Sequence, residues 1–540
     1  MQGFLRQLAD RNSDPRRRTW LFVPEDQLSQ AMGPLSREDP RTIGIILIES
    51  YWKATRRPYH QQKLALVWTN LRHFALEQAA RQVAVRYVFV DHPYHVALAP
   101  LAKELGSLQV MEPAERELRT DLASLVAAGE LRVIPHEGWL TSRAQFLRAG
   151  GSAPPWRMDR FYRTVRMETG ILIQQKRPIG GKFSFDVENR QTWKGVPPAP
   201  TPLRFPVDEI TQEVGDLIAK HYPHHPGSLE LNTIPATAQD SERLWDWVTR
   251  YCLPNFGPFE DAMSVQSRGI FHTRLSALIN IHRLLPSRIL KEAEALPIPV
   301  ASREGFIRQI LGWREFVNHV HRETDGFRQI PRHITTEAGV GRGSDHGARP
   351  SFLGATAPLP SAFWGTPSGL ACLDHVVSDV WTEEYSHHIT RLMVLANLAT
   401  LLDVSPRELT DWFWVAYTDA YDWVVEPNVL AMGTYAVGDL MTTKPYVSGA
   451  AYIDKMSDYC ECCPFDPRHT CPITHLYWAF LARHKTRLQE NPRLRLPLQG
   501  LSRRTAAQRA HDTRVFQITS TTLQSGGRLT LDVLKRPAQD

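Results

Sequence analysis

The chain lacks several features that would assign it to a broad class. None of its 540 residues falls in an uninterrupted apolar run of about 18, so we expect no membrane span. The first residues, Met1–Thr19, are polar and arginine-rich without an apolar core, which argues against a secretory signal. The N-terminal part contains neither a G-x-G-x-x-G nor a P-loop sequence, which argues against a dinucleotide or nucleoside triphosphate site there. These absences predict a cytoplasmic protein.

A large excess of one charge sign is also missing. The chain has 63 Lys and Arg against 57 Asp and Glu, a net charge of +6. Such a mild excess permits nucleic-acid binding without requiring it, because only a clustered basic patch attracts phosphates strongly. The 15 Trp and 15 Tyr residues supply many aromatic surfaces, most of which we expect in the core.

Cysteine is scarce and unevenly placed. Four of the six cysteines lie within 12 residues, at Cys460, Cys462, Cys463 and Cys471. Clustered thiols in a chain without a secretory signal indicate a metal site rather than disulfides. Three ligands would be Cys460, Cys463 and Cys471. The remaining ligand is left open among Cys462, His469, His475 and the distant Cys372. Zinc accepts thiolates and imidazoles whereas a [4Fe–4S] cluster takes four thiolates, so spacing alone does not choose the metal.

The first third of the chain predicts an α/β domain. Apolar, β-branched runs alternate with helical patterns, which is typical of a parallel, doubly wound sheet. The expected strands are Thr19–Val23, Ile43–Ile48, Val83–Val90, Leu108–Met111 and Leu131–Ile134, and the expected helices are Gln61–Arg81, Val96–Leu105 and Ala114–Ala128. Ligands of such sheets bind beyond the carboxyl ends of the strands. Asp26 and Glu49 lie at two such ends, where they either contact a ligand or cap the next helix.

The rest of the chain predicts a connector, an all-α domain and a flexible tail. The boundaries are 1–17 for an N-terminal extension, 18–138, 139–235, 236–503 and 504–540. The helices expected in the all-α domain are Trp245–Leu253, Thr273–Leu284, Arg303–His321, Leu373–Leu402 and Arg407–Tyr417. In the connector, Arg177 and Lys182 alternate with aromatic residues and a Gly-Gly pair, which suits either DNA phosphate contacts or a solvated loop. His333–Ala357 is a glycine-rich insertion to which we assign no chemistry.

A short polar string precedes one of these helices. Thr273, Arg274 and Ser276 combine hydroxyls and a guanidinium with the free amide groups of a helix start. That combination either binds an anion or simply caps the helix, which is the commoner meaning. Further along, residues 313–316 read W-R-E-F at the end of a helical pattern.

These motifs together resemble one family. Lys444–Tyr446, Tyr452–Cys460, Leu476–Phe480 and Cys372–His375, with the W-R-E-F string, are similar to the iron–sulfur bacterial cryptochrome/photolyase family, the prokaryotic (6-4) photolyases. The resemblance runs from about Arg18 to about Arg503. It implies the cryptochrome/photolyase fold: an α/β N-terminal domain that binds an antenna, a connector with a DNA-contacting loop, and a large all-α FAD-binding domain.

The resemblance also implies cofactors. They are FAD, a [4Fe–4S] cluster and a 6,7-dimethyl-8-ribityllumazine antenna. The implied cluster ligands are Cys372, Cys460, Cys463 and Cys471, with Cys462 as a bystander. The antenna is expected near Asp26 and Glu49. The implied FAD-binding residues are Thr273, Arg274, Leu275, Ser276, Asn280, Trp313, Arg314, Asp419 and Asn428.

The remaining implied residues concern the reaction. His388, His387, Tyr446 and Asp261 match the lesion pocket, and Trp412, Trp364 and Tyr452 match positions that carry electrons. We expect His387 and His388 in the middle of a helix, where only one of two adjacent side chains faces the pocket. Two residues depart from the family pattern. Phe413 stands where tyrosine is expected, which closes a side route for electrons, and Val425 stands where an acid is expected, with Glu426 one place later.

The leading hypothesis is light-dependent repair of UV-damaged DNA by a monomeric (6-4) photolyase. A second hypothesis is a cryptochrome-like blue-light photoreceptor on the same fold. A third, from another class, is a zinc-stapled nucleic-acid-binding module without flavin.

Overall fold

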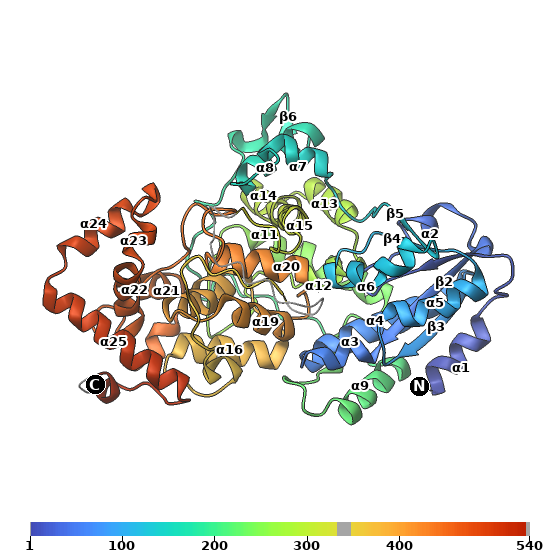
Figure 1. Ribbon diagram of the computed structural model, residues 1–540. Coiled ribbons are helices and arrows are strands. Elements are labelled where there is room, and N and C mark those ends of the chain that lie inside the picture. Colours follow the sequence, from blue (N-terminus) through green and yellow to red (C-terminus); the bar gives the residue numbers. More distant parts are fainter. Residues whose placement is uncertain (1, 332–346, 536–540) are drawn as a thin grey trace.

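Two halves of different architecture lie side by side along the length of the molecule (Figure 1). The computed structural model describes residues 2–331 and 347–535, so most of the expected insertion His333–Ala357 lies outside the described residues. The α/β half comes from the N-terminal part of the chain, and the helical half contains the rest. No helix within the described ranges is both long and apolar enough to cross a membrane.

A five-stranded parallel sheet forms the α/β half, in the order β3-β2-β1-β4-β5. Its strands are β1 (Thr19–Phe22), β2 (Ile43–Ser50), β3 (Ala84–Val90), β4 (Leu108–Met111) and β5 (Leu131–Ile134). The register pairs Leu21 with Ile45 and Ile45 with Val85. Every residue of β2 is buried, as expected of a strand covered by helices on both faces. The predicted doubly wound sheet is confirmed.

Helices cover both faces of the sheet. They are α1 (Gln2–Arg11), α2 (Pro34–Arg37), α3 (Tyr51–Arg56), α4 (Gln61–Ala80), α5 (Tyr94–Leu105), α6 (Arg116–Ala127) and, from the connector, α9 (Glu209–His221). Alternation along the strands places Leu21 and Ile45 in the core around α4, and Trp20 and Ile46 in a separate core with α5 and α6. The α4 core continues into the helical half, so the two halves share one core.

The N-terminal extension is a docked helix. α1 packs against α4 and α9, and Phe4 is fully buried. The backbone amide of Gly3 donates a hydrogen bond of 2.6 Å to Glu213 in α9. Residues 2–11 therefore belong to the α/β half.

The connector carries a hairpin that projects from the molecule beside α7 (Arg143–Gly150) and α8 (Met158–Thr169), at the top of Figure 1. Its two short strands, β6 (Ile173–Gln174) and β7 (Arg177–Pro178), pair antiparallel. Arg177 is exposed in β7, and Lys182 is exposed directly after the hairpin.

The helical half is made of short helices joined by π-helical turns. The helices are α10 (Ala238–Trp247), α11 (Leu253–Phe256), α12 (Ser276–Asn280), α13 (Pro286–Ala295), α14 (Val300–Ile307), α15 (Glu315–Glu323), α16 (Ala371–Glu383), α17 (His388–Thr390), α18 (Asn397–Leu401), α19 (Pro406–Ala416), α20 (Asp422–Glu426), α21 (Ala450–Met456), α22 (Pro472–Arg483) and α23 (Lys485–Leu488). The π-helical turns are η4 (Val248–Cys252), η5 (Arg308–Arg314), η7 (Arg391–Ala396) and η8 (Pro427–Gly433). Such turns are rare and concentrate at functional sites.

Two expected helices are shorter than predicted. The helix expected over Thr273–Leu284 is only α12, because Arg274 takes a left-handed conformation with φ of 55°. The helix expected over Leu373–Leu402 breaks after α16, where Glu384 is left-handed with φ of 51° and His387 is extended. The expectation that His387 and His388 lie in mid-helix is therefore wrong, since they begin α17.

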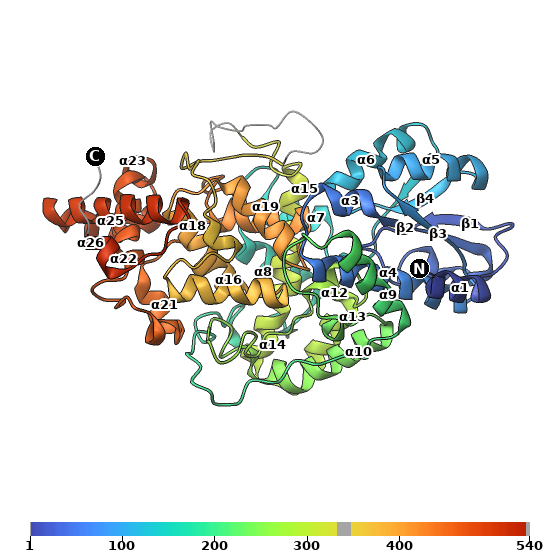
Figure 2. The ribbon, with the colours of Figure 1, turned by 90° about the horizontal axis from the view of Figure 1, so that it is seen from below.

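The expectation of a flexible tail is also wrong. The chain continues through α24 (Arg495–Arg503), α25 (Ala506–Gln524) and α26 (Leu531–Lys535). Thr505 and Gln508 form a capping box that starts α25. α25 lies along α22, with Leu523 buried and Asp512 bound by Arg504 and His475 (Figure 2).

The tail also reaches the start of α16. The amide of Leu529 donates a hydrogen bond of 2.8 Å to the carbonyl of Ser368. Gly369 is required beside it, because its φ is 87° and a Cβ there would lie 2.2 Å from the carbonyl oxygen of Leu529. The C-terminal segment thus holds both α22 and the residues that precede α16.

Replacing Leu523 by alanine tests this docking. We expect Leu523→Ala to lower the stability of the helical half by about 2–4 kcal/mol, because Leu523 is buried in the core and its truncation leaves a cavity there. Leu496→Ala is the control, since Leu496 is 78% exposed. Thermal melts of the two variants give the measurement, and equal melting temperatures would contradict the docking of α25.

Candidate active site and cofactor sites

Four cysteines line one pocket at the left of the helical half. They are Cys372 in the first turn of α16, Cys460 and Cys463 around a short 3-10 turn, and Cys471 at the start of α22. The pocket wall is otherwise apolar, with residues such as Leu370, Ile453 and Phe465. Two helices that are distant in sequence therefore meet at a cage of thiols.

The loop between Cys463 and Cys471 is closed by a single carboxylate. Asp466 accepts hydrogen bonds from the amides of Arg468 and His469, at 2.9 and 2.8 Å. Its own carbonyl accepts the amide of Cys471 at 2.8 Å. Cys462 is exposed and does not line the pocket, so the structure separates it from the other four.

The thiols are spread more widely than a single ion requires. In zinc sites with bonds of about 2.3 Å, sulfur ligands lie within about 4 Å of one another. Among the described residues, the one group of three or more His, Cys, Asp or Glu ligand atoms within 4.8 Å is His272, His387 and His388. Burial raises the pKa of Cys372 well above its ordinary value and that of Cys471 to about 12. Only a strongly bound metal centre would keep such thiols ionised.

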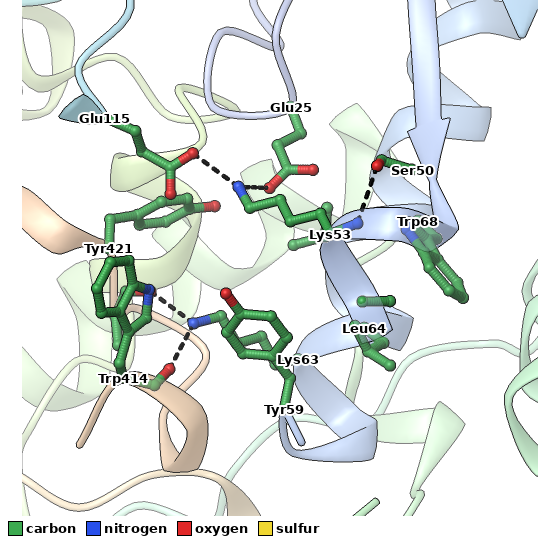
Figure 3. Close-up of a pocket in the computed structure, with 13 residues that line it drawn as sticks. Glu25, Ser50, Lys53, Tyr59, Lys63, Leu64, Trp68, Glu115, Trp414 and Tyr421 are labelled. Atoms are coloured by element: carbon green, nitrogen blue, oxygen red, sulfur yellow. Dashed lines mark hydrogen bonds and ion pairs between the residues drawn. The ribbon is translucent and has the colours of Figure 1, made fainter. Parts of the chain in front are cut away.

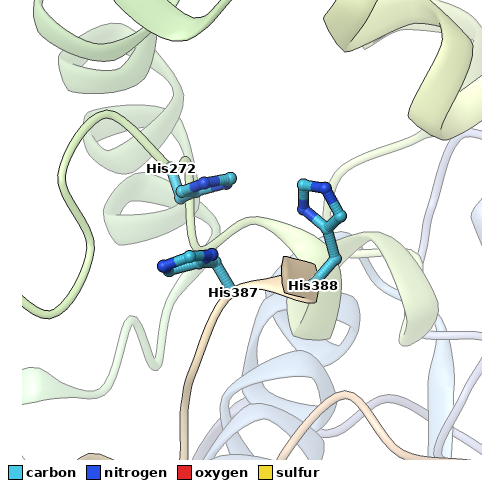
Figure 4. Close-up of side chains that lie close together, drawn as sticks. All are labelled: His272, His387 and His388. Atoms are coloured by element: carbon cyan, nitrogen blue, oxygen red, sulfur yellow. The ribbon is translucent and has the colours of Figure 1, made fainter. Parts of the chain in front are cut away.

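Three histidines gather at the start of α17 (Figure 4). The rings of His272 and His387 stack at 4.3 Å with an angle of 3° between their planes. His388 stands beside them, and its Nε2 lies 3.7 Å from Oδ1 of Asp261. His387 is buried whereas the side chain of His388 is 41% exposed. The break before α17 is what turns His388 outward.

This cluster suits proton handling better than metal binding. Burial, followed by the charge of His388, lowers the pKa of His272 to about 3, and burial lowers that of His387 well below its ordinary value. Both inner rings are therefore neutral near pH 7. The nitrogen lone pairs of two parallel rings lie in parallel planes, so one ion cannot meet both at the usual 2.0–2.1 Å without a ring rotation. His387 Nδ1 is buried without a partner.

Asp261 links the histidines to the protein surface. Tyr452 donates its hydroxyl to Asp261 at 3.1 Å, and the Arg190 guanidinium lies 3.5 Å away. Burial raises the pKa of Asp261, but the hydrogen bond and charge of His388 and the charge of Arg190 outweigh it and lower the pKa. No hydrogen bond joins Tyr446 to either histidine in the described part of the chain. Tyr446 is half-buried nearby, among the charges of Asp186 and Arg190.

A second polar cluster surrounds Asp419. Arg391 binds its carboxylate with two hydrogen bonds of 3.0 Å, Ser276 donates to it at 2.7 Å, and Asn280 donates to its backbone carbonyl at 2.9 Å. Burial raises the pKa of Asp419, but Arg391 more than compensates and lowers it. Arg391 comes from the π-helical turn η7, and sequence analysis missed it.

The other residues expected around the flavin lie in three separate segments: just before α12, in η5 and in η8. Arg274 pairs with Glu383 at 2.5 Å and stacks on Tyr385, whereas Leu275 is buried directly before α12. Arg314 is buried between Glu315 and the Trp139 ring, beside the half-buried Trp313. The last two residues of the expected set are Thr273 and Asn428. Thr273 is half-buried, and Asn428 donates a hydrogen bond of 2.8 Å to the Val424 carbonyl.

Glu426 does not replace the missing acid at Val425. One of its oxygens lies 3.0 Å from Nε2 of His321 and the other accepts a hydrogen bond of 2.8 Å from Arg407. Those contacts hold the buried carboxylate in place. Val425 is itself buried and supplies no polar group.

Tryptophans form a line from the interior to the surface. Trp412 is buried and Trp364 is 47% exposed, and the two are bridged by Trp381 of α16. Sequence analysis missed Trp381, because nothing in its local sequence distinguishes it from a packing residue. Tyr452, expected with these tryptophans, instead lies with Asp261.

A second pocket lies between the two halves, beyond the carboxyl ends of the strands (Figure 3). Lys53 bridges Glu25 and Glu115 at 2.6 Å each, and Lys63 donates to the carbonyls of Trp414 and Ala420 at 2.8 and 2.5 Å. Aromatic rings complete the lining: Tyr59, Trp68, Trp414 and Tyr421. Burial lowers the pKa of Lys63 to about 7. Both lysines were missed, because each lies on a helix without a motif.

Asp26 and Glu49 adjoin this pocket without lining it. Glu49 is sealed in the core by Arg72, with hydrogen bonds of 2.7 and 2.8 Å, and by the Tyr87 hydroxyl at 2.6 Å. Asp26 is buried with one carboxylate oxygen unpartnered, and burial raises its pKa to about 7. The neighbours Glu25 and Ser50 face the pocket instead.

Comparisons with known proteins agree with the fold. A family model described as deoxyribodipyrimidine photo-lyase-related protein matches residues 21–233. A (6-4) photolyase from Agrobacterium fabrum is 31% identical over 517 residues, which cover 92% of this chain and 97% of the relative. An uncharacterised protein of Acanthamoeba polyphaga mimivirus is 39% identical over 66 residues, 12% of this chain and 54% of that protein. A class III photolyase structure from Agrobacterium tumefaciens aligns with a TM-score of 0.51 and 14% identity over 94% of this chain and 98% of that one, a likeness in fold.

The buried histidine pair makes a pH prediction. His272 has a folded pKa of about 3, below the ordinary 6.5, so the unfolded chain takes up the proton first. The free energy of unfolding should therefore fall as the pH drops from 6.5 towards 3, by up to about 1.4 kcal/mol per pH unit for this residue. Denaturant unfolding of His272→Gln should show a shallower fall, while exposed His224→Gln should match the wild type. Equal slopes for His272→Gln and the wild type would contradict the neutral assignment.

Proposed function

Because the chain belongs to the photolyase family that includes the Agrobacterium (6-4) photolyase, we propose that it repairs UV-damaged DNA in light, with the (6-4) photoproduct as its substrate. One observation carries the choice of site. His388 is half-exposed beside Asp261, and it is backed by the neutral pair His272 and His387. This arrangement places a possible proton donor, His388, at the protein surface, and it places two uncharged imidazole rings behind it.

FAD fits the donors of the helical half. Arg274 uses one of its five N–H groups on Glu383, so its remaining N–H groups are donors for a diphosphate, whereas the Ser276 hydroxyl beside it already donates to Asp419. Asn280, Asp419 and Arg391 supply a fixed polar wall. Thr273, Leu275, Trp313, Arg314 and Asn428 complete the proposed set. Reduced FAD, when bound, supplies an electron to the lesion under blue light.

This chain's own residues handle the lesion and its proton. A damaged base must leave the stack, which costs a few kcal/mol and is cheapest for a base that no longer pairs. We assign Asp261 and Tyr452 to hold the extruded lesion at the rim, with Tyr446 beside them. His388 gives a proton to the oxygen that moves between the two bases, and Asp261 stabilises its protonated form. The uncharged ring of His387 packs beside His388 and helps to hold it in position.

A [4Fe–4S] cluster suits the cysteine cage. Four thiols from α16, the start of α22 and the turn between α21 and α22 line one apolar pocket, and four thiolates are the ligand set that a [4Fe–4S] cluster takes. We propose Cys372, Cys460, Cys463 and Cys471 as its ligands. Because it would join helices far apart in sequence, the cluster would stabilise the fold. Its thiolates fit the reducing cytoplasm, where we place the protein.

An antenna and a DNA contact complete the proposal. The aromatic pocket between the halves, next to the unpartnered Asp26, suits the planar ring of 6,7-dimethyl-8-ribityllumazine. Arg177 on the projecting hairpin is exposed and is proposed to bind DNA phosphates. Lys182 pairs with Glu188 at the surface and would exchange that partner for phosphate. We propose that the protein acts as a monomer.

The cluster assignment is tested by two cysteine variants. Cys372→Ala should lose most of its iron and melt at a lower temperature, because one ligand disappears. Cys462→Ala should keep its iron, since this thiol lies outside the cage. Iron and acid-labile sulfide in anaerobically purified protein give the measurement. Stoichiometric zinc without iron in the wild type would refute the cluster.

The repair assignment is tested on a defined lesion. Reduced protein under blue light should restore a (6-4) photoproduct in an oligonucleotide. His388→Ala should lose this activity by about two to four orders of magnitude, the usual contribution of a general acid, while keeping FAD and iron. His387→Ala should lose less. Wild-type protein that repairs nothing while holding FAD would favour the photoreceptor alternative, and wild-type repair by His388→Ala would remove that residue as the acid.

A further inference from the structure

We propose that residues 483–528, here called the basic segment, form a second DNA-contacting surface that holds the phosphate backbone of the duplex beside the lesion. This inference rests on the proposed function, because it concerns how the damaged duplex is held. It gives the C-terminal helices α23, α24 and α25 a partner of their own, in addition to the contact proposed for the hairpin.

Positive charge is concentrated in the basic segment. Of the 63 Lys and Arg in the chain, ten lie in this segment, together with only two of the 57 Asp and Glu. The rest of the chain carries 53 basic and 55 acidic residues, so the net charge of +6 arises entirely from the basic segment. A cluster of this kind attracts phosphates, whereas the same excess spread evenly over the surface would not.

Most of these charges have no acidic partner. Lys485, Arg493, Arg495, Arg503 and Arg509 are all exposed, and no ion pair joins any of them to a carboxylate within residues 2–331 and 347–535. Their like charges repel one another across the surface of α23, α24 and the start of α25. A row of phosphates would relieve that repulsion and would release its own condensed counterions.

Exposed arginines elsewhere on the molecule are commonly paired. Arg37 lies 2.6 Å from Glu137, and Arg148 lies 2.9 Å from Glu168. Such pairs neutralise the charge of each guanidinium and leave little field around it. The basic segment therefore differs from the rest of the surface both in the number of its charges and in their freedom to bind an external anion.

The basic segment passes beside the proposed lesion site. The side chain of Asn491 donates a hydrogen bond of 2.9 Å to the carbonyl of Thr443, and its oxygen accepts the amide of Arg493 at 3.0 Å. Burial raises the pKa of Tyr446, and the charges of Arg190 and Arg493 oppose that rise. Arg493 is thus fixed close to the ring that we place at the rim of the lesion site.

From this point the basic segment leads away along the surface. The 3-10 turn η10 (Pro492–Leu494) runs into α24, whose nine residues span about 13 Å. B-DNA rises about 3.4 Å per base pair, so α24 matches the backbone of about four base pairs. In Figure 1, α23 and α24 lie at the left end of the molecule, apart from the hairpin that projects at the top. The two basic surfaces are therefore separate contacts.

The surface of the basic segment suits a phosphate backbone better than a lipid bilayer. A helix that lies on a membrane buries a continuous apolar face among the lipids. Among the described residues of this segment, Leu496 is the one exposed large apolar side chain. Backbone contacts of DNA need only charge and hydrogen-bond donors, which exposed arginines supply.

The test measures binding in the dark to a duplex that extends several helical turns beyond a (6-4) lesion, and to the same duplex without the lesion. The triple variant Arg493→Gln, Arg495→Gln and Arg503→Gln should bind both duplexes more weakly than the wild type. Each lost phosphate contact should flatten the dependence of log Kd on log salt by about 0.9, or about 2.7 for three contacts. Fluorescence anisotropy over a range of salt concentrations gives the slopes.

A second triple variant, Lys103→Gln, Arg132→Gln and Lys220→Gln, is the matched control. These three side chains are exposed in α5, β5 and α9 of the α/β half, and none has an ion pair in the described part of the chain. The control removes the same net charge away from the basic segment, so its salt slope should match that of the wild type. FAD content, iron content and thermal melts establish that both variants are folded.

The outcomes separate this inference from the proposed function. An unchanged slope in the first variant, or an equal change in both variants, would overturn the DNA-contacting role of the basic segment. Binding of the wild type to phosphatidylserine vesicles, with no change of the DNA slope in the first variant, would assign the segment to a membrane surface instead. Wild type that repairs no lesion would overturn the proposed function, whereas a flattened slope in the first variant would still support the DNA contact.

Discussion

The buried helix α4 is the constraint on which both halves depend. Nearly all of its side chains are buried, because one face covers the sheet and the other meets the helical half. Lys63 lies at that second contact, with its ammonium held by the carbonyls of Trp414 and Ala420 and over the rings of Tyr59 and Tyr421. No carboxylate among the described residues is hydrogen-bonded to this amine, so its position depends on both carbonyls. The two halves are therefore parts of one folding unit.

The chemistry of the helical half depends on breaks in its helices. Two left-handed residues interrupt the helical backbone. Arg274 does so just before Ser276 of the Asp419 cluster, and Glu384 does so just before His387 and His388. Continuous helices would point neighbouring side chains about 100° apart and would carry the histidines past Asp261. Instead His387 faces inward and His388 outward, and Arg391 follows one turn later in η7. Irregular backbone thus sets the positions of His387, His388 and Arg391.

The sequence predicted the parts that hydrophobic patterns control. Strands such as β2 are uniformly apolar, so their existence and order of appearance could be read directly, and the cysteine spacing located three of the four thiols that line one pocket. The break at Glu384 could not be predicted, because the residues around it include no glycine or proline and left-handed geometry there is imposed by tertiary contacts. The docking of α25 was missed for a similar reason: its polar surface is typical of a tail, and its buried residues are only Asp512, Val515, Thr519 and Leu523. Trp381 and Lys63 were missed because the groups that they contact come from other segments of the chain.

The docked tail has a consequence for the order of synthesis. Ser368 and Cys372 leave the ribosome well before Cys471, and α25 and Leu529 leave it after Cys471. The cysteine cage is thus complete in the nascent chain while the segment that binds both α22 and the residues before α16 is still being made. The proposed cluster would thus have its four thiols available before the C-terminal segment packs against α22 and the residues before α16.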